Sequence, residues 1–122
     1  MKKILYIASI LYLVILFILM LMPLGDGSVK INNTFIVGFR GDYLLHILVY
    51  TPWLIVGKIL LKDACKPLLW IFLGVIVAVA LEFSQMWLPY RGFNINDLIF
   101  SVVGVFLSSV FYWLLRNYFS KR

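Results

Sequence analysis

Residues 68–88, LLWIFLGVIVAVALEFSQMWL, form an apolar run that contains a single charged residue, Glu82. The hydrocarbon core of a bilayer is about 30 Å thick, so a helix needs about 20 such residues to cross it. A soluble domain leaves about a third of its surface in water, and an apolar run like this one cannot form such a surface. The stretch therefore predicts a transmembrane helix, and Glu82 is the exception within it.

Three further stretches have the same character, at about residues 4–22, 43–61 and 95–115. Of the 122 residues, 64% are hydrophobic and only 13% are charged, which excludes a soluble domain because the polar residues are too few to cover its surface. We predict an all-α fold in which residues 1–122 form a single domain, a four-helix transmembrane bundle. The sequence after the first span lacks an Ala-x-Ala-like cleavage site, so we expect this span to remain uncleaved.

Basic residues are divided unequally between the two ends of such a bundle. Eight belong to the termini and to the loop between the second and third spans, and three belong to the other two loops. The eight are Lys2, Lys3, Lys58, Lys62, Lys66, Arg116, Lys121 and Arg122, and the three are Lys30, Arg40 and Arg91. Because cytoplasmic loops are enriched in Lys and Arg, both termini are predicted to be cytoplasmic. The net charge of +6 is then a topology signal, and we expect no nucleic-acid partner.

Tryptophans occur near the ends of three predicted spans, at Trp53, Trp87 and Trp113. The indole ring is amphipathic and is enriched at the two membrane–water interfaces. We therefore expect these three residues to be interfacial anchors.

Ionisable residues gather near the predicted extracytoplasmic ends of the spans. A charged side chain inside lipid costs roughly 2.5–3.5 kcal/mol on insertion scales, so such residues face a partner or a pathway. The four candidates for a catalytic polar site are Asp42, His46, Glu82 and Asp97.

Helical spacing directs these residues toward the bundle interior. Asp42, His46 and Tyr50 recur at every fourth position and share one face of their helix. Asp97 and Ser101 have the same spacing on the fourth span. Polar faces avoid lipid and turn toward other helices, so we expect them to meet at one end of the bundle. The residues expected to bind a ligand beside the polar site are Tyr50, Gln85, Arg91 and Ser101.

The residue types in this cluster are compatible with more than one chemistry. Carboxylates beside an imidazole can hold a divalent metal, transfer protons, or form a structural network that joins the helix ends. Asp97 also suits the first turn of a helix, where negative charge is favoured. Arg40 and Arg91 are suited to hold a phosphate or carboxylate group of a ligand. No metal or cofactor can be named from the residues, and they leave open whether a reaction is catalysed.

Two segments resemble the VanZ-like family of small bacterial membrane proteins: GDYLLHILVY at residues 41–50 and LEFSQMWLPYRGFNINDLIFSVVG at residues 81–104. The family pattern is an Asp-x-x-x-His-x-x-x-Tyr/Phe block, a Glu-x-x-Gln block, and an Arg followed six residues later by Asp and then by Gly. The matching positions are Asp42, His46, Tyr50, Glu82, Gln85, Arg91, Asp97 and Gly104. Two positions depart: Tyr43 replaces the usual Lys, and Ser101 replaces the usual Asn.

The resemblance implies a multi-pass protein of the bacterial cell membrane, and the founding member of the family is linked to teicoplanin resistance. We expect an extracytoplasmic polar pocket that binds or acts on a cell-envelope ligand and affects glycopeptide susceptibility. The expected partners are the lipid bilayer and a lipid-linked envelope precursor or glycopeptide-related ligand, and a homo-oligomer is left open.

Two alternative functions remain. The first is a metal-dependent membrane hydrolase or transferase that uses the four polar-site residues. The second is a small proton-coupled transporter, although Glu82 lies near one face of the membrane and alternating access favours a site at the midplane.

Overall fold

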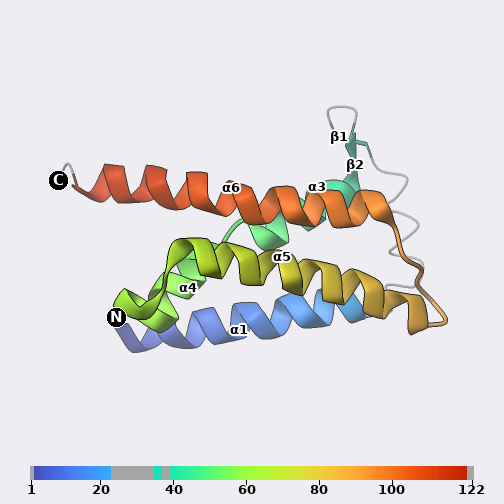
Figure 1. Ribbon diagram of the computed structural model, residues 1–122, viewed down its shortest axis with the longest axis horizontal. Helices are drawn as coiled ribbons and strands as arrows, with labels where there is room; N and C mark the ends of the chain where they lie inside the picture. Colours follow the sequence, from blue (N-terminus) through green and yellow to red (C-terminus); the bar gives the residue numbers. More distant parts are fainter. Residues whose placement is uncertain (1, 23–34, 37–38, 121–122) are drawn as a thin grey trace.

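The computed structural model describes residues 2–22, 35–36 and 39–120. Four spans are long and apolar enough to cross a membrane, so the predicted all-α, four-helix transmembrane bundle is confirmed (Figure 1). The helices are α1 (Lys2–Leu21), α3 (Gly41–Tyr50), α4 (Trp53–Leu61), α5 (Pro67–Ser84) and α6 (Ile95–Ser120), and α3 and α4 together make the second span. Two 3₁₀ turns, η1 (Lys62–Ala64) and η2 (Gln85–Trp87), follow α4 and α5.

The two ends of the bundle differ in what they contain. One end, here the terminal end, holds both chain termini and the α4–α5 connection (Figure 1). The other, here the hairpin end, holds the α5–α6 connection and the short antiparallel pair β1 (Phe35–Ile36) and β2 (Phe39–Arg40). The cytoplasmic location of the terminal end remains a prediction. Three basic residues used for it, Lys30, Lys121 and Arg122, lie outside the described residues.

The second span is broken, whereas the apolar run predicted one continuous helix over residues 43–61. α3 ends at Tyr50 and α4 begins at Trp53, because Pro52 has no N–H to donate and its ring disturbs the preceding helical turn. Thr51 compensates in part, since its backbone N and its Oγ1 both donate to the carbonyl of Ile47, at 3.0 and 2.8 Å. The proline was a visible signal for this break.

A reciprocal tryptophan contact joins α4 and α5. Trp53 Nε1 donates to the Trp70 carbonyl at 2.8 Å and Trp70 Nε1 donates to the Trp53 carbonyl at 2.7 Å, with the rings stacked at 5.2 Å. The Trp70 ring covers Gly57 and the Trp53 ring covers Gly74, and a Cβ at either glycine would overlap the ring. Trp53 is buried, so its prediction as an interfacial anchor is wrong: its N–H has a partner inside the protein. The other two predicted anchors are exposed.

α6 packs closely along α3, and Gly104 permits this approach. A Cβ at Gly104 would lie 2.6 Å from the carbonyl oxygen of Ile47 and 2.9 Å from Cβ of Tyr50. Gly104 is therefore a packing notch, as expected where two membrane helices come close. Ser101 and Asp97, one and two turns earlier on α6, are thereby brought opposite α3.

On the other side of the bundle, α1 packs against α4 and α5. The buried apolar core between the helices consists of Leu16, Met20, Tyr50, Trp53, Ala78, Leu81 and Val105. The exposed apolar residues of each helix face outward, where a bilayer would cover them.

Candidate functional site

His46 lies between Ser101 and Asp97, where α3 faces α6. Its Nδ1 is 2.8 Å from Ser101 Oγ, and its Nε2 is 3.8 Å from Asp97 Oδ2. The His46 and Ser101 side chains are both buried. The four-residue spacing of Asp97 and Ser101 places one on each side of the imidazole ring, so the structure brings together three residues from the two predicted polar faces.

The two sides of the imidazole are not equally satisfied. The contact to Ser101 has hydrogen-bond length, whereas 3.8 Å to Asp97 is too long for a direct hydrogen bond. An ionised carboxylate only accepts, so an ionised Asp97 would favour the tautomer with its proton on Nε2, in which Nδ1 accepts from the Ser101 hydroxyl. Asp97 Oδ1 is buried and receives no hydrogen bond from any described residue. The cluster is thus complete on the serine side and incomplete on the aspartate side.

A second set of contacts joins the start of α3 to α6. Arg40 Nη2 pairs with Asp42 Oδ2 at 2.8 Å, and the Arg40 guanidinium lies 4.9 Å from the centre of the Tyr43 ring. The Tyr43 hydroxyl accepts hydrogen bonds from Arg40 Nη1 at 3.4 Å and from Asn96 Nδ2 at 3.2 Å. The Tyr43 ring also stacks on Phe100 at 4.7 Å. Tyr43, one of the two departures from the family pattern, therefore positions Arg40 against α6.

Glu82 connects α5 to the start of α6. It is 2% exposed, and its Oε1 accepts a hydrogen bond from the backbone N of Asn94 at 3.0 Å. Asn94 Oδ1 accepts in turn from the backbone N of Asn96 at 3.1 Å, the geometry of a helix N-cap. Since Asn94 caps α6, Asp97 is not needed as the cap, and its side chain faces His46 instead.

Gln85 and Arg91 serve the C-terminal end of α1. Gln85 Nε2 and Arg91 Nη1 both donate to the carbonyl of Met20, at 3.0 and 2.7 Å. The Tyr90 hydroxyl donates to the carbonyl of Leu21 at 2.9 Å. The last carbonyls of a helix have no partner within it, and these side chains supply one.

The four candidate polar-site residues interact through their charges and are not arranged as ligands of one metal ion. Glu82 and Asp42 both act electrostatically on Asp97, and Arg40 and Arg91 oppose them. In the described part of the chain, no three His, Cys, Asp or Glu residues are grouped so that they could hold a metal ion. The cluster is therefore a mixed-charge network with one imidazole at its centre.

Some predicted residues lie elsewhere, and others received no role from the sequence. Tyr50, predicted to bind a ligand, is fully buried in the core. Tyr43 and Tyr90 received no role from the sequence, because a tyrosine in an apolar stretch does not indicate its partner. Asn94 and Asn96 did carry a signal, since asparagine just before an apolar run is typical of a helix start.

Comparison with known proteins adds one finding. A family model described as VanZ/LLP1 matches residues 9–116, a segment that contains every predicted site residue. Neither a curated protein nor a solved structure was found to match the chain.

Proposed function

The chain belongs to the VanZ/LLP1 family, and we propose that it acts in the bacterial cell membrane by binding a cell-envelope ligand at the α3–α6 cluster. This cluster comprises Asp42, His46, Asp97 and Ser101. The excess of basic residues at the terminal end supports a cytoplasmic location for that end, which puts the cluster on the extracytoplasmic side. A ligand there would be lipid-linked or related to peptidoglycan.

The unsatisfied oxygen of Asp97 carries the proposal. A buried acceptor without a hydrogen bond is costly, by about 1–3 kcal/mol and more for a charged group. Among the described residues Asp97 Oδ1 is such an acceptor, and the 3.8 Å gap between Asp97 Oδ2 and His46 Nε2 lies beside it. A hydroxyl or amide N–H of a ligand that donates to Asp97 would complete the network. We infer that the site is kept incomplete for that group.

The rim of the cluster supports an anionic group on the same ligand. Arg40 is held by Asp42 and Tyr43, yet its side chain remains 33% exposed. A guanidinium held in place in this way is suited to a carboxylate or phosphate because it presents several donors in a fixed plane. The expected ligand therefore combines a donor group with an acidic group.

Binding is the role that the geometry supports best. Ser101 contacts His46 in the arrangement of a nucleophile and its base, but it is only 2% exposed, whereas the Asp97 side chain is 16% exposed and is the more accessible of the two to a ligand. Ser101 is therefore better suited to orient the imidazole than to attack a substrate.

The test is teicoplanin susceptibility of a bacterial host that expresses the chain. We expect wild-type protein to lower susceptibility, and Asp97→Asn and His46→Gln to return it to the level of the empty vector. Immunoblots of membrane fractions must show equal protein amounts. The matched control is Asp63→Asn, the same chemical change in η1 between α4 and α5, which should behave as wild type.

Two results would count against this function. If wild-type protein leaves susceptibility unchanged, a role in glycopeptide response is wrong. If Asp97→Asn acts as wild type at equal expression, the carboxylate does not receive a ligand. The melting temperature separates these from a folding defect: Asp97→Asn should be at least as stable as wild type, because it removes a partly buried charge that accepts no close hydrogen bond from the described residues.

A further inference from the structure

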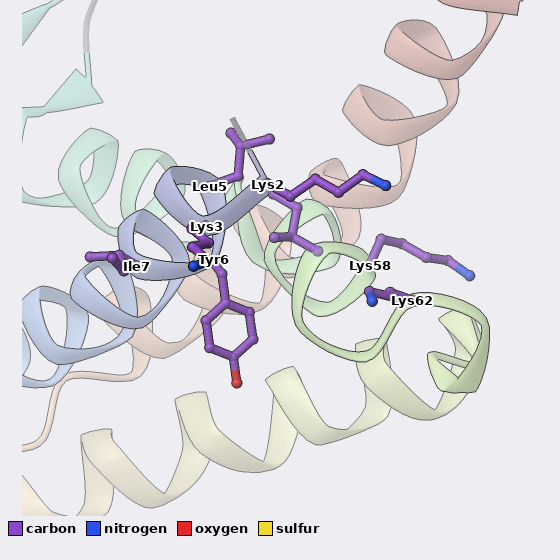
Figure 2. Close-up of a pocket in the computed structure, with 8 residues that line it drawn as sticks. Lys2, Lys3, Leu5, Tyr6, Ile7, Lys58 and Lys62 are labelled. Carbon is purple, nitrogen blue, oxygen red and sulfur yellow. The ribbon is translucent and has the colours of Figure 1, made fainter.

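A groove at the terminal end lies far from the α3–α6 cluster, between the start of α1 and the end of α4 (Figure 2). Its volume is about 660 Å³. The charged residues that line it are all basic: Lys2, Lys3, Lys58 and Lys62. None of the described lining residues is acidic, so the groove concentrates positive charge.

The lysines are placed where lipid headgroups would be. Lys2 opens the first span, and Lys62 directly follows Leu61, the last residue of the second span. In Figure 2 the side chains of Lys2 and Lys58 extend toward the same side. The rest of the groove wall is mainly apolar and includes Leu5, Ile7 and Ile59. A groove that combines lysines with an apolar wall matches an anionic headgroup followed by acyl chains.

Two of the lysines are held in position by the fold. Lys58 Nζ donates to the carbonyl of Cys65 at 2.7 Å, which occupies one of its three N–H donors and leaves two for a ligand. Lys62 has a φ of 51°, and no other non-glycine residue in the described segments has a positive φ. Glycine would adopt this conformation without strain, yet the position carries a lysine that lines the groove.

We propose that this groove binds an anionic phospholipid of the membrane leaflet at the terminal end. The lysines of the groove would attract the phosphate, and the apolar wall would contact the upper part of an acyl chain. A free soluble anion fits less well, because it would leave that wall without a partner. Basic pockets at membrane-helix ends recognise anionic headgroups by this combination of charge and position.

The experiment uses purified full-length protein in a non-ionic detergent, with melting temperature measured against added phosphatidylglycerol. The test variants are Lys62→Gln, whose side chain makes no hydrogen bond to another described residue, and Lys3→Gln in case the first fails to fold. The control is Lys66→Gln, the same loss of charge at the N-cap of α5, outside the groove. Phosphatidylcholine and inorganic phosphate are titrated in parallel.

Phosphatidylglycerol should raise the melting temperature of wild type and of Lys66→Gln with the same half-maximal concentration. For Lys62→Gln and for Lys3→Gln this concentration should rise about fivefold, the factor expected for one basic residue near an anionic headgroup. Equal concentrations for the groove and control variants would overturn the proposal. So would an equal effect of phosphatidylcholine, or a full effect of inorganic phosphate alone, which would indicate a site for free anions.

Discussion

Replacement of Gly104 by alanine tests whether the close approach of α3 and α6 builds the candidate site. The added Cβ would lie 2.6 Å from the Ile47 carbonyl oxygen, and ordinary contact begins at about 3.4 Å, so the helices must separate by about 0.8 Å. The carbonyl cannot turn away freely because it accepts two hydrogen bonds from Thr51. The same displacement would lengthen the 2.8 Å contact between His46 and Ser101 to about 3.6 Å, beyond hydrogen-bond range.

The expected loss of stability is about 2–4 kcal/mol. Overpacking of a close contact costs about 1–3 kcal/mol, and a lost buried hydrogen bond adds about 1 kcal/mol. The assays are thermal unfolding in one detergent and the susceptibility assay above. Gly104→Ala should melt at a lower temperature than wild type and should return susceptibility to the level of the empty vector. Gly92→Ala is the matched control: a Cβ at Gly92 meets no atom within 4 Å, and its stability should change by less than about 0.5 kcal/mol. If the two variants melt together, the argument that Gly104 sets the spacing of α3 and α6 is refuted.

Two further predictions concern the hairpin end and the α4–α5 connection. Gln85→Leu and Arg91→Gln should each lower the free energy of unfolding by about 1 kcal/mol, because the other residue still donates to the Met20 carbonyl. The double variant should lose more stability than the sum of the two single variants. Additive losses of melting temperature in a double-mutant cycle would contradict this sharing of the carbonyl. The single cysteine, Cys65, is buried, and burial raises the pKa of its thiol although Lys58 opposes the shift. Because the thiolate is the reactive form, maleimide labelling near neutral pH should be slower in the folded than in the denatured protein, and it should accelerate only at higher pH. Equal labelling rates of the folded and denatured protein across the pH range would exclude a buried thiol with a raised pKa.

Helical spacing indicated which polar residues share a helix face, but not how those residues pair. Helical spacing placed Asp97 and Ser101 on one face, and both do contact His46. It did not indicate that Glu82 bonds to the backbone of Asn94. Nor did it indicate that Gln85 supports the end of α1. Spacing reports which residues share a face of one helix, whereas pairing depends on how neighbouring helices are rotated about their axes.

The sequence by itself determined the four spans, because crossing a bilayer requires only a sufficient length of apolar residues, a property of each segment alone. It also determined that both termini lie at one end, since four spans return the chain to the side where it began. Only the tertiary structure decided that Trp53 is buried against Gly74, that α6 approaches α3 at Gly104, and that one oxygen of Asp97, beside His46, has no hydrogen-bond partner among the described residues. These outcomes depend on contacts between residues far apart in the chain, where the absence of one Cβ sets the distance between two helices and hence which polar atoms meet.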